Sequence, residues 1–321
     1  MHLAQSVPSR RSSVDASRIL ILVFCLLWSS AFAVAKFALA DCPPLVLLTA
    51  RCLLAGVVIL GAAMIWRADW RLSRRDLLVL AGLGVINNAI YLGLSVSGMQ
   101  SVSAGLAALI ISANPVLTAL LAAVFLGERM TWRKSAGLFL GVVGVAIVVG
   151  GRINGGADGL IGIVLVTGAL VALVGGTILF KRLSPGGSLW IGNGVQNLAG
   201  GVALAPFAVA FEGSEQVVPS WRLVAAIAYL ALLVSVFGYL LWMHLLTVSG
   251  ATKASAYHFL MPPLGLLFGW ILLGESVAAV DLISILPIAL GIYLVTRHAP
   301  TASQSSRMPS IMIATNSGRT K

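Results

Sequence analysis

Residues 112–128 read SANPVLTALLAAVFLGE, and residues 259–275 read FLMPPLGLLFGWILLGE. When the two stretches are laid on one another, Pro115 meets Pro262, and both stretches end in the triplet Leu-Gly-Glu. Matches between apolar residues arise easily in an apolar chain, but a helix-breaking proline and a charged residue do not. The shared positions therefore predict an internal repeat, with one copy in each half of the chain.

Further matches lie around these stretches at nearly the same spacing. Gly144 corresponds to Gly291, and Lys36 corresponds to Lys181. The repeat therefore extends well beyond the two quoted stretches and covers most of each half.

The composition indicates a membrane protein. Of the 321 residues, 59% are hydrophobic and only 10% are charged, whereas a soluble domain carries about 25% charged residues. The charges fall in short gaps between apolar runs, and about 20 apolar residues span a bilayer as a helix that satisfies its own backbone. The net charge of +11 flanks these runs, which is typical of membrane anchoring. A basic face with interleaved aromatic residues, as in nucleic-acid binding, is not found. We therefore expect an all-α, polytopic protein embedded in the lipid bilayer.

Ten apolar segments predict ten transmembrane helices with short connections, and their boundaries are approximate. The segments are Arg18–Ala40, Pro43–Trp66, Leu77–Val96, Val102–Leu126, Trp132–Val149, Gly159–Phe180, Ser188–Phe211, Leu223–Leu245, Thr252–Leu273 and Val280–Val295. Five segments fall in a first repeat over residues 18–150 and five in a second over residues 158–296. Residues 1–17 and 299–321 are predicted to be cytoplasmic tails, the second of them disordered.

The start of the chain allows another reading. Arg10-Arg11 before an apolar stretch and the small residues around Phe32 resemble a cleaved signal peptide. The apolar stretch is longer than the core of such a signal. We therefore favour an uncleaved first helix.

The orientation follows from the distribution of Lys and Arg. If the N-terminus lies inside, nearly all basic residues of the connections also lie inside, and the outside loops hold only Arg152 and Arg222. Basic residues accumulate on the cytoplasmic side of membrane proteins. This pattern predicts a multi-pass protein of the cytoplasmic membrane with both termini cytoplasmic. Because each half holds five segments, an odd number, the second half enters the membrane with the opposite orientation. Such inverted repeats are common among secondary transporters.

The chain resembles the drug/metabolite transporter superfamily, specifically EamA-type permeases. The resemblance is carried by Trp-Ser-Ser-Ala-Phe at Trp28–Phe32, by Arg51 in Thr-Ala-Arg, and by the twin Pro…Leu-Gly-Glu blocks, over roughly residues 19–296. The second half departs from this pattern, with Val-Gly-Gly at Val174–Gly176 in place of the tryptophan block.

The resemblance implies a secondary transporter rather than an enzyme. It implies that an amino acid, another small metabolite or a drug crosses the membrane by alternating access, and we expect export. The cavity would be made by spans one, three, four, six, eight and nine, with no cofactor and no metal. A coupling proton or ion and a homodimer are partners that the resemblance leaves open.

Three prolines are expected to break helices near the middle of the membrane. Pro115 lies in the fourth segment, and Pro262 and Pro263 lie in the ninth. A proline leaves a backbone carbonyl of the preceding turn without its usual donor, and interrupted helices at matching positions of two halves point to a binding site. A kink that only shapes packing is the alternative.

Polar side chains inside spans are costly unless they face the interior of the bundle. We expect the following residues to line a substrate cavity: Trp28, Ser29, Asn87, Asn88, Tyr91, Asn114, Tyr239, Trp242, Tyr257 and His258. Hydrogen bonding between helices is the competing explanation for each of them.

Two basic side chains inside spans have open roles. His258 could carry a coupling proton, since its unperturbed pKa is near neutrality, although a permanently neutral histidine is more common. Arg51 could bind a carboxylate through its planar fork, but snorkelling or capping of backbone carbonyls is the interpretation that the sequence favours.

Two carboxylates close the repeated stretches. Glu128 and Glu275 follow the ends of the fourth and ninth segments, where we expect them to form a structural turn by accepting from free N–H groups of the next helix. Cys25, Cys42 and Cys52 form no CxxC pair, so neither a disulfide nor a metal site is predicted.

Two other classes of protein compete with transport. A membrane-embedded enzyme would need His, Asp or Glu clustered at one interface, and the acidic residues are scattered instead. A non-transporting scaffold or receptor would need a docking surface, and the loops are short. Substrate accumulation in vesicles would separate transport from both.

Overall fold

A computed structural model of the chain describes residues 10–67, 70–127, 130–154, 159–212, 217–242, 244–245 and 260–296. Within these ranges the chain forms helices and no strand. Eight stretches are helical, long and apolar enough to cross a bilayer. The predicted class, an all-α polytopic membrane protein, is confirmed.

Five of the eight spans are single helices, and three are built from shorter pieces. The single helices are α1 (Arg10–Ala38), α2 (Pro44–Ile65), α7 (Trp132–Asn154), α8 (Leu160–Leu183) and α9 (Leu189–Phe211). The composite spans are α3 (Arg74–Gly84) with η1 (Val85–Tyr91) and α4 (Leu92–Gly98); α5 (Ala104–Ile111) with α6 (Asn114–Phe125); and α10 (Trp221–Ala228) with η2 (Tyr229–Gly238).

Two further helices are shorter than a full span. These are α12 (Met261–Leu273) and α13 (Ala279–Thr296), of which Met261–Leu273 and Ala279–Gly291 are apolar over fewer than 18 residues. The ninth predicted segment begins at Thr252, outside the described residues. Eight spans are therefore shown, and the total of ten stays a prediction.

Serine side chains begin several of the helices. The Oγ atoms of Ser73, Ser103 and Ser220 accept from the backbone N–H three residues further on, at 3.0, 3.1 and 3.0 Å. Such caps satisfy N–H groups that have no partner inside the helix. The cap at Ser103 fixes the start of α5, which lies against the candidate site.

The glycine of each Leu-Gly-Glu triplet ends its helix in the same way. Gly127 after α6 has φ 68°, and Gly274 after α12 has φ 66°. This left-handed conformation suits glycine because it has no Cβ. The repeated triplet therefore encodes the same sharp helix end in both halves.

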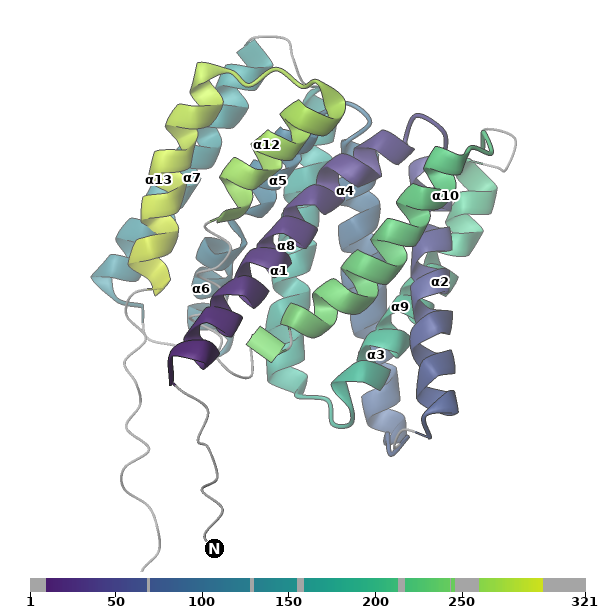
Figure 1. Cartoon of the computed structure of the whole chain (residues 1–321). Helices are drawn as coiled ribbons and strands as arrows, with labels where there is room; N and C mark the ends of the chain where they lie inside the picture. The colour runs from purple at the N-terminus through teal and green to yellow at the C-terminus, as the bar shows by residue number, and fades with distance from the viewer. Residues whose placement is uncertain are drawn as a thin grey trace, which may run out of the picture.

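The helices form one bundle with a close-packed pair at each end (Figure 1). At one end α13 packs along α7, and at the other α2 packs along α9, with α1 and α8 between them. A Cβ on Gly291 would lie 2.6 Å from the carbonyl oxygen of Gly137 and 2.8 Å from the nitrogen of Gly141. The small-residue face of α7 is thus the contact surface for α13, as expected for close helix packing.

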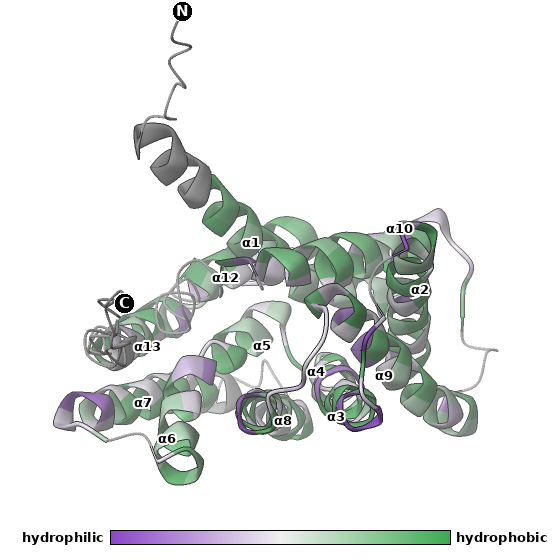
Figure 2. Ribbon diagram, turned by 90° about the horizontal axis from the view of Figure 1, so that it is seen from below, coloured by the Kyte–Doolittle hydropathy of each residue, from purple (hydrophilic) through white to green (hydrophobic). Residues whose placement is uncertain are grey.

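Most of the helical surface is apolar, and hydrophilic residues gather toward helix ends and loops (Figure 2). Large side chains such as Ile65, Ile161 and Phe211 are more than three-quarters exposed. In water this exposure would be unfavourable, whereas in a bilayer the same side chains contact lipid.

Candidate functional site

A cavity of about 380 Å³ lies inside the bundle. Its volume falls in the range of about 300–1,000 Å³ that small-molecule sites occupy. The walls come from α1, α2, the composite spans α3–η1–α4 and α5–α6, α8, α9, and the span that contains η2. Helices from both halves of the chain therefore contribute to a single site.

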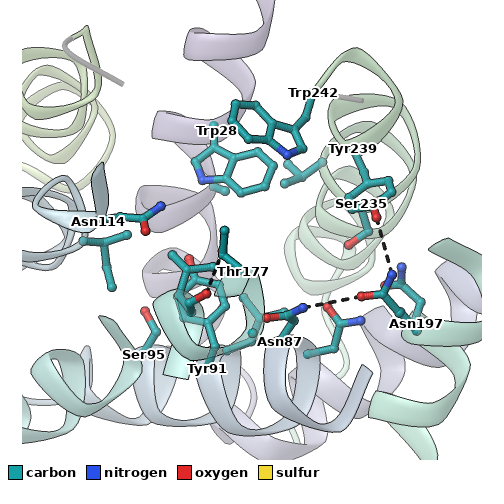
Figure 3. A pocket seen from close by; sticks show the side chains of 18 of the residues that line it. Trp28, Asn87, Tyr91, Ser95, Asn114, Thr177, Asn197, Ser235, Tyr239 and Trp242 are labelled. Atoms are coloured by element: carbon teal, nitrogen blue, oxygen red, sulfur yellow. Dashed lines mark hydrogen bonds between the residues drawn. The ribbon is translucent and has the colours of Figure 1, made fainter. Parts of the chain in front are cut away.

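One wall of the cavity is aromatic. Trp28 of α1 and Trp242, in the helical turn after η2, both line it, and Figure 3 shows their rings close to one another. Phe24 lies 5.4 Å from each of them, between ring centroids, and is fully buried. Phe24 therefore fixes two tryptophans that offer an apolar surface to a bound molecule.

The facing wall carries amides and hydroxyls. Asn87 donates to Gln196 Oε1 at 3.4 Å, and Gln196 donates to the Tyr239 hydroxyl at the same distance. Asn193 donates to the carbonyl oxygen of Ser235 at 2.9 Å. These bonds join spans three, seven and eight, and Figure 3 shows Asn87, Ser235 and Tyr239 around the cavity. The network positions polar groups at the cavity surface without using charges.

One acceptor in this network has no partner. Asn197 donates to the carbonyl oxygen and to the Oδ1 of Asn193, at 3.0 and 2.7 Å. The Oδ1 of Asn197 is buried and accepts nothing in the structure, and the residue is only 3% exposed. An unsatisfied buried carbonyl of this kind is costly, and this oxygen is covered by protein rather than open to the cavity.

Arg51 of α2 brings a guanidinium to the same cavity. It lines the cavity and is 6% exposed, and its Nε donates to the Ser235 Oγ at 3.0 Å. Lys181, near the end of α8, is exposed and also lines the cavity. Among the described lining residues there is no Asp or Glu, so the charges at this site are positive.

The described part of the chain offers no metal site. No group of three His, Cys, Asp or Glu residues that could hold an ion occurs there, and the three cysteines are free and buried. The lining itself offers hydrogen-bonding groups, apolar surface and positive charge.

Most of the residues predicted to line a cavity are brought together. Seven of the ten line it: Trp28, Asn87, Asn88, Tyr91, Asn114, Tyr239 and Trp242. Ser29 is the exception, because its side chain is buried at 1% exposure and is not part of the lining. Tyr257 and His258 lie outside the described residues.

The prolines of both halves lie in the first turn of a helix, Pro115 in α6 and Pro262 in α12. Pro115 lines the cavity, just after the helix is interrupted between Ile111 and Asn114. Pro262 and Pro263 lie in the first turn of α12 and are not part of the described lining. A proline in the first turn costs no helical hydrogen bond.

The seventh span was not expected to contribute, yet it supplies Asn193, Gln196 and Asn197. Their spacing of three and four residues puts them on one helix face. Three amides in an otherwise apolar helix are a recognisable signal. The contribution of the seventh span could therefore have been predicted from the sequence, and the expected set of cavity helices was too narrow.

Glu275, just after α12, joins the two halves of the chain at the start of α5. Its Oε1 and Oε2 accept from the N–H groups of Ala104 and Gly105 at 2.7 and 3.0 Å. Lys36 of α1 lies 3.9 Å from Glu275 and donates to the carbonyl oxygen of Val102. The N–H groups that Glu275 meets thus belong to α5 in the other half, and not to the helix that follows it. Glu128 lies outside the described residues.

Comparisons with known proteins agree with this architecture. The profile of the EamA-like transporter family matches residues 16–150 and 160–297. A protein of Chlamydia trachomatis serovar D, named S-adenosylmethionine/S-adenosylhomocysteine transporter, is 31% identical over 82% of this chain and 83% of its own. The uncharacterized transporter YvbV of Bacillus subtilis is 27% identical over 86% and 90% of the two chains.

A third relative and a solved structure extend these likenesses. The uncharacterized inner membrane transporter YedA of Escherichia coli K12 is 25% identical over 84% of this chain and 87% of its own. One crystal structure, at 20% identity, matches with a TM-score of 0.61 over 88% of this chain and 97% of that chain. That likeness shows a shared fold.

Proposed function

Since the chain belongs to the EamA-like transporter family, we propose that it is a secondary transporter that moves a small metabolite, amino acid or drug by alternating access. The family and the named relatives are transporters and not enzymes. The observation that carries the proposal is the cavity of about 380 Å³ at the centre of the bundle. It joins an aromatic wall to a hydrogen-bonded polar wall, which is the composition of a small-molecule site.

The packing of the helices supports an inverted repeat. Each helix of the first half has a counterpart in the second: α1 pairs with α8, α2 with α9, η1 with η2, α6 with α12, and α7 with α13. The contacts of α1 with α12 and η2 are then answered by contacts of α8 with α6 and η1. The contact of α2 with η2 is answered by that of α9 with η1. Two halves related in this way can expose a site between them to either side in turn.

The proposed direction of transport depends on which end of the cavity is open. We infer that the contacts of Glu275 and Lys36 close one end, while the exposed Lys181 lines the other. The predicted orientation puts Lys181 on the cytoplasmic side, together with both termini. A cavity that faces the cytoplasm is the state in which an exporter loads its substrate, and we propose export from the cytoplasm.

The residues that line the cavity limit the ways in which transport could be coupled to an ion gradient. Because the described lining residues include no Asp or Glu, coupling through a cavity carboxylate is disfavoured. His258 remains the candidate for a coupling proton, and a homodimer remains compatible with the proposal. Uptake into everted vesicles with and without a pH gradient would test the coupling.

The test begins with binding. The purified protein is screened by thermal shift against amino acids, nucleosides, toxic cations and S-adenosylmethionine, and hits are followed as radiolabelled uptake into everted vesicles. Tyr91→Ala and Trp242→Ala should each abolish the shift and the uptake. Trp221→Ala removes a tryptophan that is 78% exposed on α10 and serves as the control that should retain both. Binding that survives both cavity variants would show that the cavity is not the binding site, and uptake absent for every hit would refute transport.

A further inference from the structure

The guanidinium of Arg51 is buried, but only one of its nitrogens has a protein partner. Its Nε donates to Ser235 Oγ at 3.0 Å. Within the described ranges, Nη1 and Nη2 form no hydrogen bond and no ion pair. Neither atom is among the fully buried polar atoms without a partner, so both must face the cavity that Arg51 lines.

No negative charge among the described residues balances Arg51. The ion pair found there is between Lys36 and Glu275, and the cavity lining contains no carboxylate. A buried cation without a partner is strongly unfavourable. Keeping one at 6% exposure is explained if a negative group binds there during the working cycle.

We propose that Arg51 is the residue that binds a carboxylate of the transported molecule, so that the substrate is an organic anion. This inference rests on the proposed transport function. The two free nitrogens of the guanidinium match the two oxygens of a carboxylate in a bidentate pair. Ser235 holds Nε and so fixes the direction in which the other two nitrogens point.

The charges and the opposite wall define the rest of the substrate. One guanidinium balances one negative charge, which favours a carboxylate over a doubly charged phosphate. Trp28 and Trp242 provide the surface for an apolar or aromatic remainder. Lys181, the other cation of the lining, lies at the exposed end of the cavity, where it would attract anions from solution.

A purely structural role would leave part of this geometry unexplained. The bond to Ser235 joins α2 to η2, and that bond alone needs a single donor. Such a hydrogen bond between helices explains the position of Nε but gives Nη1 and Nη2 no function beside the cavity. The two roles are separable, because a structural role predicts lower stability without any preference for charge in the ligand.

The experiment compares ligands that differ only in charge. Purified full-length protein is titrated with 3-phenylpropanoate, with its neutral amide 3-phenylpropanamide, and with phenyl phosphate, and binding is followed by tryptophan fluorescence and thermal shift. Three variants are measured in parallel with the unmodified protein: Arg51→Gln, Arg51→Lys and, as the control, Arg222→Gln. Arg222 is exposed on α10 and outside the cavity, so its replacement removes the same charge at a distance from the site.

The carboxylate should bind at least roughly tenfold more tightly than the amide, since hydrogen bonds between charged groups are the strong ones. Arg51→Gln should abolish this preference, Arg51→Lys should keep part of it, and Arg222→Gln should keep all of it. Equal binding of acid and amide, a preference that survives Arg51→Gln, or tighter binding of phenyl phosphate would overturn the proposal. Carboxylate binding without any vesicle uptake would refute transport and leave the anion site intact. Uptake of the amide but not of the carboxylate would support transport and refute the anion site.

Discussion

Replacing Glu275 by glutamine should weaken the closed end of the cavity. The carboxylate accepts from two backbone N–H groups at the start of α5, at 2.7 and 3.0 Å, and lies 3.9 Å from Lys36. Glutamine has nearly the same shape but offers one carbonyl oxygen and no charge. The change therefore removes one of the two charge-assisted bonds and the interaction of a negative charge with the helix N-terminus.

The expected loss is about 2–3 kcal/mol. A hydrogen bond to a charged group contributes about 1.5–3 kcal/mol, and a charge at a helix N-terminus about 0.3–1 kcal/mol. The pair with Lys36 adds little, because the Lys36 side chain is 27% exposed and the atoms are 3.9 Å apart. If these contacts exist only while this end is closed, the equilibrium between the open and closed states shifts toward the open state by a factor of about 30–150.

Two measurements distinguish a loss of protein stability from opening of the cavity. Thermal unfolding in detergent should show Tm lowered by roughly 3–6 °C. Met99 is 1% exposed and lines the cavity near this end, so a Met99→Cys reporter, with the native cysteines replaced by alanine, measures opening. An impermeant maleimide added outside should label the reporter at least about tenfold faster in Glu275→Gln.

Glu212→Gln is the matched control. Glu212 Oε2 accepts from the N–H groups of Leu45 and Val46 at the start of α2, at 2.8 and 3.1 Å, without an ion pair in the described residues. It should lower Tm without faster labelling, since α2 and α9 stay packed together. If Glu275→Gln lowers Tm but leaves the labelling rate unchanged, the contacts of Glu275 with α5 and Lys36 do not hold the cavity closed.

Three further changes test the packing and the chemistry of the fold. Burial raises the pKa of Cys42 to about 11, so the thiolate is scarce at pH 7; maleimide should label it about a hundredfold more slowly than in the unfolded chain, with labelling rising only as the pH approaches 11. Gly291→Ala should lower stability by about 1–3 kcal/mol in thermal unfolding, because its Cβ would lie 2.6 Å from Gly137, whereas Gly61→Ala, which meets nothing within 4 Å, should be neutral or stabilising. Gly274→Ala forces alanine to φ 66° and should cost about 1–2 kcal/mol by the same measurement, a loss that Gly274→Asn should reduce.

Apolar patterning predicted the eight spans that the structure shows, and polar side chains inside apolar segments predicted seven of the cavity residues. Membrane spans are read easily from sequence, because lipid demands long apolar helices. The same physics gives polar residues inside a span a strong preference for the interior. Asn87 and Tyr239 could therefore be assigned to a cavity without knowledge of the tertiary packing.

The partners of those residues could not be predicted. The sequence favours a structural role for Arg51, and nothing in it indicates that Ser235, far away in the chain, accepts from its Nε. Ser29 was expected at the cavity, but the rotation of α1 turns it into the packed interior. Such rotations depend on long-range contacts between helices, which a single sequence does not encode in any short pattern.

The wide helical turns of η1 decide how span three faces its neighbours. Lining residues recur there at every fourth position, as Asn87, Tyr91, Ser95 and Met99. In a plain α-helix of about 3.6 residues per turn, every fourth residue drifts by about 40°, and a row of four would wind away from the site. A π-helical stretch holds more residues per turn, and mixing it with α-helix straightens the row. Deleting one residue from Val85–Tyr91 would therefore leave the span apolar and helical, yet turn its polar row toward lipid.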